Sequence, residues 1–183
     1  MTNTTHFLVP DRIESDRLVL RTFRNEDLPF LHAHYSDAEC TRFTFRRALS
    51  EAESWYAMAN MIGHWQLRGY GPYAVEEKAT GAVLGTVGLW YPHDWPEPEI
   101  KWALTRSYWG KGYASEAARA VHAMAAQHLP QVPLISLIHS ENAASIALAL
   151  ALGANFDKET PFRGGIWHIY RHRAPDSAAA AAR

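Results

Sequence analysis

Apolar and polar positions divide the N-terminal third of the chain into one strand and two helices. The alternating stretch DRLVLRTF predicts a strand from Leu18 to Phe23. The next stretch, NEDLPFLHAHYSD, starts with helix-capping residue types at Asn25 to Asp27 and continues with helical spacing. A second helix is predicted in SEAESWYAMANMIGHWQLRG, where Ser50 stands three residues before Glu53, as in a capping box, and Gly69 ends the pattern.

In the middle of the chain the apolar period changes from helical to alternating. The stretch YAVEEKATGAVLGTVGLWY predicts a hairpin of two strands with its turn at Lys78 to Gly81. The stretch EIKWALT predicts a third strand, one side of which is formed by Ile100, Trp102 and Leu104.

The C-terminal half alternates between helices and strands. A helix is predicted from about Gly112 to His128, followed by the apolar strand PLISLIHS and a helix in ENAASIALALALG that ends at Gly153. NFDKET and GIWHIYRH predict two last strands around Pro161 to Gly165. This order of elements indicates an α/β sandwich, in which helices cover a mixed sheet.

Composition narrows the class of protein. The chain has 183 residues, of which 48% are apolar, and this suits one domain over residues 1–173. The final stretch, APDSAAAAAR, predicts a disordered alanine-rich tail over residues 174–183. A net charge of −1 lacks the basic excess of nucleic-acid-binding proteins, so no nucleic acid partner is expected.

Cysteine content and hydropathy bear on the compartment. Cys40 is the one cysteine of the chain, so no disulfide can form within it, and a cytoplasmic location is expected. The N-terminal stretch MTNTTHFLVPDRIES lacks the pattern of a signal peptide. The longest apolar run is shorter than the roughly 20 residues that span a bilayer, so no membrane partner is expected.

The stretch SYWGKGYASEAARAV places a glycine-rich turn where a helix begins. Free N–H groups and the helix dipole attract an anion at such a position, and Gly110 and Gly112 let it come close. The Walker pattern is absent, and the dinucleotide pattern GxGxxG is incomplete because Ser115 replaces its third glycine. The alternative is a helix entry that uses glycine and binds no ligand.

Around this turn the sequence resembles the acetyl-CoA motif of the GNAT superfamily of N-acetyltransferases, Q/R-x-x-G-x-G/A. Trp109, Gly112 and Ala114 fall on its marked positions, with Trp in place of Gln or Arg. The Trp-Gly-Lys-Gly-Tyr-Ala form is typical of the branch that contains the ribosomal-protein-alanine N-acetyltransferases. ESDRLVLRTFRNEDLPFLHAHYSD resembles the opening of that branch, and NAASIALALALG resembles its second signature. The resemblance runs from about Glu14 to His172.

The resemblance implies a mostly antiparallel sheet of six to seven strands with helices on both faces. It implies acetyl-CoA as cosubstrate, no metal, an amine acceptor, and a monomer or homodimer. The pyrophosphate of CoA would be bound by Trp109, Gly110, Lys111, Gly112, Tyr113, Ala114 and Ser115. The pantetheine arm would pair with the backbone of Ala103, Leu104 and Thr105 and accept or donate a hydrogen bond at Asn142.

Acetyl transfer to a protonated amine needs a base, and Glu99 is the candidate. It matches the Glu of the branch's Glu-Ile-Gly-Tyr stretch, in which Lys101 here replaces the Gly and Trp102 the Tyr. The alternative for Glu99 is an exposed pair with Lys101 that contributes little. Glu97 is the rival base.

The departing thiolate benefits from a proton donor. Many members of the superfamily use a tyrosine seven residues after the Asn, but here that position is Ala149. Ser145 is the remaining hydroxyl; it would hydrogen-bond the sulfur, or it caps the helix instead. His139 is the runner-up for moving this proton.

These features predict an acetyl-CoA-dependent N-acetyltransferase that transfers acetyl directly to a primary amine, either a protein N-terminus or a small molecule. The alternative is a non-catalytic acyl-CoA-binding module. A phosphoryl-transfer enzyme is a third possibility, which the missing Walker pattern disfavours. Two histidine pairs, His32 with His34 and His168 with His172, lack further ligands at zinc-site spacing, so no metal site is predicted.

Overall fold

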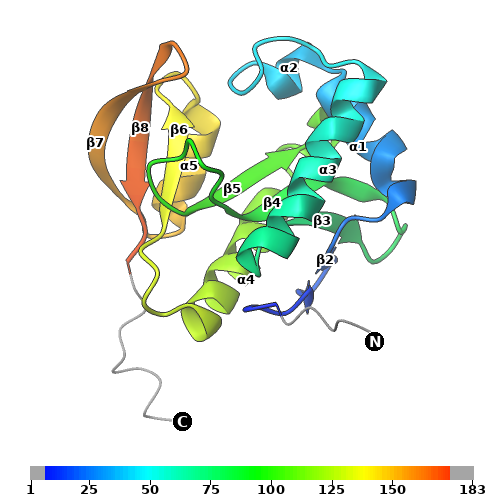
Figure 1. Ribbon diagram of the computed structural model, residues 1–183, viewed down its shortest axis with the longest axis horizontal. Helices are drawn as coiled ribbons and strands as arrows, with labels where there is room; N and C mark the ends of the chain where they lie inside the picture. Colours follow the sequence, from blue (N-terminus) through cyan, green and yellow to red (C-terminus); the bar gives the residue numbers. More distant parts are fainter. Residues whose placement is uncertain (1–6, 174–183) are drawn as a thin grey trace.

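Eight strands form one mixed sheet in the computed structural model of the chain, which describes residues 7–173 (Figure 1). The strand order is β1-β2-β3-β4-β5-β6-β8-β7, and only β5 and β6 pair in parallel. The strands are β1 (Arg12–Glu14), β2 (Leu18–Arg21), β3 (Pro72–Glu77), β4 (Val83–Trp90), β5 (Glu99–Leu104), β6 (Ile135–His139), β7 (Asn155–Phe162) and β8 (Gly165–Arg171). The predicted α/β sheet is confirmed, with one strand more than expected.

The additional strand is β1, which pairs antiparallel with β2 at the edge of the sheet. Three residues are too few to show an alternating pattern, so the sequence does not predict it. The predicted alanine-rich tail lies outside the described residues, and the domain limits stay a prediction. Within residues 7–173, none of the helices combines the length and apolar character needed to cross a membrane.

Four of the five helices within residues 7–173 were predicted, and the short helix α2 (Ala38–Thr41) was not. The predicted helices are α1 (Leu28–Tyr35), α3 (Glu51–Arg68), α4 (Tyr113–His128) and α5 (Ala143–Ala151). Ser50 and Glu53 form the predicted capping box of α3, and Gly69 closes that helix in the left-handed conformation. Short 3₁₀ turns at Asn25–Asp27 and Arg106–Tyr108 precede α1 and α4.

Helices cover both faces of the central strands (Figure 1). Leu31 of α1 and Met61 of α3 pack with Ala74 in one apolar cluster. Val121 of α4 packs with Ile100 in the other. The central strands are therefore buried on both sides, which explains the nearly continuous apolar runs of their sequences.

The sheet divides between β5 and β6. These two strands share a single register pair, Glu99 with Ile135, whereas β6 pairs with β8 along its whole length. Beyond that pair β5 and β6 diverge, and Figure 1 shows β3–β5 and β6–β8 fanning apart. The edge of β5 that faces β6 is consequently left open toward its C-terminal end.

Candidate functional site

The glycine turn lies directly after the open edge of β5, at the start of α4. Gly110 has φ 73° and Gly112 has φ 80°, a left-handed conformation that strains residues with a Cβ. A Cβ on Gly110 would meet nothing within 4 Å, so conformation rather than crowding requires glycine there. Gly112 is the N-cap of α4, which places the turn at the positive end of the helix dipole.

The backbone of this turn has unused hydrogen-bond donors. The bonded N–H groups at its two ends are those of Trp109, which donates to Arg106 O, and Glu116, which donates to Gly112 O. Among residues 7–173, the N–H groups from Gly110 to Ser115 donate no hydrogen bond to a backbone or side-chain acceptor. Unpaired donors that surround a helix N-terminus form a binding site for an anion such as a phosphate group.

Arg17, just before β2, fixes the shape of the turn. Its Nη1 donates to Lys111 O (3.1 Å), and its Nε donates to Oε2 of Glu116 (2.7 Å). The guanidinium also lies 4.3 Å from the ring centroid of Tyr113. Arg17 and Glu116 are 99 residues apart, so no local sequence signal identifies this contact. The arginine holds the turn in its donor-exposing conformation before any ligand binds.

The open edge of β5 is formed by other residues than the sequence suggests. The Thr105 N–H donates to Leu84 O of β4 (2.8 Å). Because successive residues of a strand point their backbone groups to opposite edges, Ala103 also faces β4, whereas Trp102 and Leu104 face the opening. Leu104 O already accepts a hydrogen bond from Nε1 of Trp109 (2.6 Å). Of the predicted trio, only Leu104 presents its backbone to the opening.

Glu99 lies where β5 and β6 separate, and it is 5% exposed. Its Oε2 accepts a hydrogen bond from the Leu137 N–H (3.1 Å). Burial raises the pKa of Glu99 to about 7, against the opposing effects of that N–H, Lys101 and Trp95. A carboxyl group with this pKa exchanges its proton near neutral pH. The buried position also differs from the exposed pair with Lys101 that the sequence left open.

The rival carboxylate, Glu97, is held in an ion pair. Its two oxygens accept hydrogen bonds from Nη1 and Nη2 of Arg171, both at 2.8 Å. This bidentate contact lowers the pKa of Glu97. A carboxylate with a lowered pKa and an engaged pair of oxygens is a weak base for an incoming ammonium group.

Asn142 and Ser145 meet at the start of α5. Asn142 is the N-cap, and its Oδ1 accepts a hydrogen bond from the Ser145 N–H (3.2 Å). Oγ of Ser145 accepts another from Nε1 of Trp102 (3.1 Å), which reaches across from β5. Asn142 therefore supplies the cap, and the hydroxyl proton of Ser145 is directed away from the indole toward a further acceptor.

Lys101 and His139 lie on the same face of the sheet as Glu99. Nζ of Lys101 is 5.2 Å from the ring centroid of Trp90. His139 ends β6 beside the aromatic cluster of β6 and β8, and Trp95 joins that cluster to Trp90 at 6.3 Å. We call this surface, defined by Glu99, Lys101 and His139, the acceptor face.

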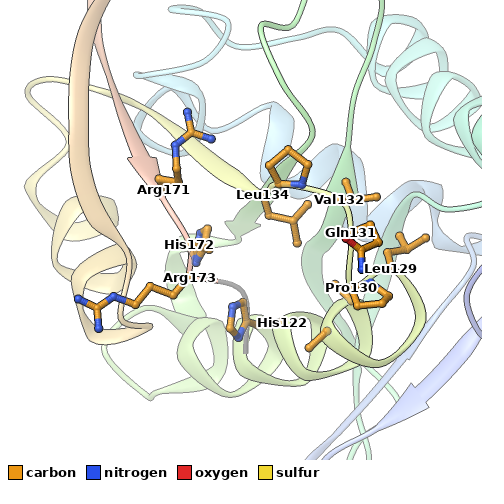
Figure 2. A pocket seen from close by; sticks show the side chains of 12 residues that line it. His122, Leu129, Pro130, Gln131, Val132, Leu134, Arg171, His172 and Arg173 are labelled. Carbon is orange, nitrogen blue, oxygen red and sulfur yellow. The ribbon is translucent and has the colours of Figure 1, made fainter. Parts of the chain in front are cut away.

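A cavity of about 300 Å³ lies away from these groups, at the C-terminal end of α4. Figure 2 shows His122, His172 and Arg173 beside it. A helix of 16 residues is about 24 Å long, so α4 separates the cavity from the glycine turn. In the part of the chain that the structure describes, no three potential metal ligands of the His, Cys, Asp and Glu types gather in one place.

Comparisons with known proteins agree with this geometry. The family described as acetyltransferase (GNAT) domain matches residues 17–155. The uncharacterized N-acetyltransferase p20 of Bacillus licheniformis is 29% identical over 151 residues, which cover 81% of this chain and 84% of that relative.

Solved structures share the fold. An acetyltransferase from Agrobacterium tumefaciens strain C58 superposes with a TM-score of 0.80 at 25% identity, over 90% of this chain and 95% of that chain. The ribosomal-protein acetyltransferase RimL in complex with coenzyme A superposes with a TM-score of 0.71 at 19% identity, over 90% of this chain and 96% of that chain.

Proposed function

The chain belongs to the GNAT acetyltransferase family, and on that premise we propose how its residues move an acetyl group from acetyl-CoA to a primary amine. The row of unbonded N–H groups from Gly110 to Ser115 carries this proposal. The two phosphates of CoA accept hydrogen bonds from these donors at the positive end of α4, and the side chain of Lys111 adds a cation.

The rest of the acetyl-CoA molecule lies along the open edge of β5. The pantetheine arm has amide groups, which pair with the backbone of Trp102 and Leu104 as an added strand would. The amide nitrogen of Asn142 contacts the same arm from α5. This path brings the thioester near the junction of β5 and β6, beside Glu99.

In the reaction, Glu99 accepts a proton from the ammonium form of the acceptor, directly or through one water. The free amine then attacks the thioester carbon, and the C–N bond forms. The tetrahedral intermediate collapses as the C–S bond breaks, and the second nitrogen proton passes to the departing sulfur. The Ser145 hydroxyl donates a hydrogen bond to that sulfur while its charge develops.

Direct transfer requires no covalent intermediate on the protein. Cys40 is half-buried, and burial raises the pKa of its thiol, which is the opposite of what a cysteine nucleophile needs. We place the reaction in a reducing cytoplasm, because a single cysteine forms no intramolecular disulfide.

The oligomeric state is expected to be a monomer or a homodimer. Sedimentation of the purified protein distinguishes these two assemblies.

A thiol-release assay with acetyl-CoA and a panel of amines tests the function, together with calorimetry of CoA binding. The expected result is CoA binding, and thiol release that depends on the amine. Binding without thiol release from any amine would instead identify a non-catalytic acyl-CoA-binding module. Absence of binding to the folded protein would refute the proposal.

A further inference from the structure

Arg46 carries an unpaired cation at the edge of the acceptor face. It follows α2 in a left-handed conformation (φ 58°) and is exposed. The neighbouring arginines have acidic partners: Arg47 pairs with Glu53 (2.5 Å). Across residues 7–173, the Arg46 guanidinium makes no ion pair and no hydrogen bond with another side chain or the backbone. A charge that is held out of all internal pairs is available to a ligand.

Arg46 and His139 border one small space. A Cβ added to Gly165, the first residue of β8, would lie 2.6 Å from Nη2 of Arg46 and 3.2 Å from Nε2 of His139. The absence of a side chain at Gly165 therefore lets the Arg46 guanidinium pack close to the strand, next to the His139 ring. These contacts join the loop after α2, the end of β6 and the start of β8, and Figure 1 shows α2 on the side of the molecule where β6 ends.

The His139 ring is fixed as a donor toward that space. Its Nδ1 accepts a hydrogen bond from the Glu141 N–H (3.3 Å), so a neutral ring carries its proton on Nε2. Phe43 and Trp167 hold the ring at centroid distances of 5.4 and 5.6 Å. An N–H donor beside an unpaired guanidinium suits the two oxygens of a carboxylate.

Charged groups of both signs lie around the acceptor face. Lys101 lies on it, and Arg163 borders it while paired with Asp94 (2.8 Å). The facing carboxylates are Glu99, which the reaction uses as its base, and Glu141, which is exposed. Burial lowers the pKa of Lys101, so Arg46 is the exposed cation of this face without an acidic partner among residues 7–173, and it favours an acceptor that carries a negative group.

We propose that the acceptor is a primary amine that also carries a carboxylate, which Arg46 and His139 bind while the amine reaches Glu99. This inference rests on the proposed acetyltransferase function and names its substrate class. Free amino acids and peptides with an acidic second residue share this chemistry. They differ in how far the carboxylate lies from the amine.

Matched acid and amide acceptors test the inference in the thiol-release assay. One arm compares free amino acids with their α-amides, and the other compares Ala-Glu with Ala-Gln, both with blocked C-termini. The acid member of at least one arm is expected to have the higher kcat/KM, by about tenfold or more, since a charge-assisted hydrogen bond contributes that much. The arm that shows the preference identifies the source of the carboxylate.

Three variants connect the preference to Arg46 and Gly165. Arg46→Gln is expected to abolish the preference, Arg46→Lys to retain part of it, and Gly165→Ala to reduce it by displacing the guanidinium. Arg42→Gln, an exposed arginine on the same loop, is the control and is expected to keep the preference. Each protein must keep the wild-type KM for acetyl-CoA.

The outcomes separate this inference from the proposed function. Equal rates for acids and amides, a faster polyamine, or a preference that survives Arg46→Gln would each overturn the substrate class alone. Failure of the wild-type protein to bind acetyl-CoA would overturn the function on which it rests.

Discussion

Glu99 combines two properties at the residue scale that a catalytic carboxylate needs. It is buried at the point where β5 and β6 separate, and its pKa is raised by that burial rather than by a neighbouring acid. The hydrogen bond from Leu137 fixes one oxygen and leaves the other for a proton. Burial destabilises a charged carboxylate, and here it raises the pKa of Glu99 to a value at which the group exchanges protons near neutral pH.

Replacement of Glu99 tests its role as base. Glu99→Gln keeps the size of the side chain but cannot accept the proton, so kcat/KM is expected to fall by roughly 10²- to 10⁴-fold. For the wild-type protein kcat/KM should rise with pH through about 7, and this rise should disappear in the variant. Glu97→Gln is the matched control; if it caused the larger loss of activity, Glu97 would be the base.

Ser145 and Asn142 are separated by comparing activity with stability. Asn142→Ala removes the cap of α5 and is expected to lower the free energy of unfolding by about 1 kcal/mol. Ser145→Ala removes the hydroxyl that we propose bonds the departing sulfur, together with the acceptor of the Trp102 N–H, so kcat should fall by about tenfold and the free energy of unfolding by about 1 kcal/mol at most. A loss of stability without a loss of kcat in Ser145→Ala would assign this residue a purely structural role.

At the scale of elements, the glycine turn and the open edge of β5 form one continuous surface, which we propose binds acetyl-CoA. The Trp109 indole links them, because it donates to Leu104 O at the end of the strand. Arg17 braces the turn from β2, so the surface is assembled from the first and central parts of the sequence. The N–H donors are therefore positioned without a ligand, which lowers the entropic cost of binding.

Gly112→Ala tests the conformation of the turn. A Cβ at φ 80° costs roughly 1–2 kcal/mol, and relief of that strain rotates the nearby N–H groups away. CoA affinity measured by calorimetry is expected to fall by about tenfold or more. Gly81→Ala is the matched control, since Gly81 has φ 72° but lies in the β3–β4 turn; a Cβ there would meet nothing within 4 Å, and one at Gly112 would be in ordinary contact with Nη2 of Arg17 at 3.5 Å. An equal loss of affinity in both variants would contradict a specific role for the turn.

Apart from the short elements β1 and α2, the helices and strands were predictable from sequence because each depends on local periodicity. The capping box at Ser50 and the glycine entry to α4 are examples, since both use residues within one turn of a helix. The residues of β5 whose backbone groups point to the open edge were not predictable. Alternation within EIKWALT shows which side chains share a face of the sheet, but not which backbone groups pair with β4. The contacts of Arg17 and Arg46 were also out of reach, because they join segments far apart in the sequence.

At the scale of the whole molecule, the sheet is divided into two parts, and the buried Glu99 lies where they join. β1–β5 carry the large helical layers, and β6–β8 carry α5 and an aromatic cluster. A single register pair joins the two parts at Glu99 and Ile135. In a continuous sheet, β6 would pair with the whole edge of β5. The division leaves part of that edge open, and we propose that acetyl-CoA binds to it.

This junction has a consequence for stability. Because the folded-state pKa of Glu99 is about 7 and its ordinary value is 4.5, the folded protein binds the proton more tightly than the unfolded chain does. The stabilising contribution is complete below pH 4.5 and is lost as the pH rises to about 7, by roughly 3 kcal/mol. Urea unfolding at pH 5 and pH 8 should show this loss, and Glu99→Gln should show less of it. An identical pH dependence in the two proteins would contradict the raised pKa.

The central claim is that the backbone donors from Gly110 to Ser115 bind the diphosphate of acetyl-CoA. Its most direct measurement is an NMR titration of ¹⁵N-labelled protein with CoA, in which each backbone N–H is followed separately. The largest shifts are expected at Gly110, Lys111, Gly112, Tyr113, Ala114 and Ser115, and inorganic pyrophosphate should shift the same signals more weakly. Unchanged signals in this turn on saturation with CoA, or shifts confined to the cavity beside His122 and His172, would contradict the claim.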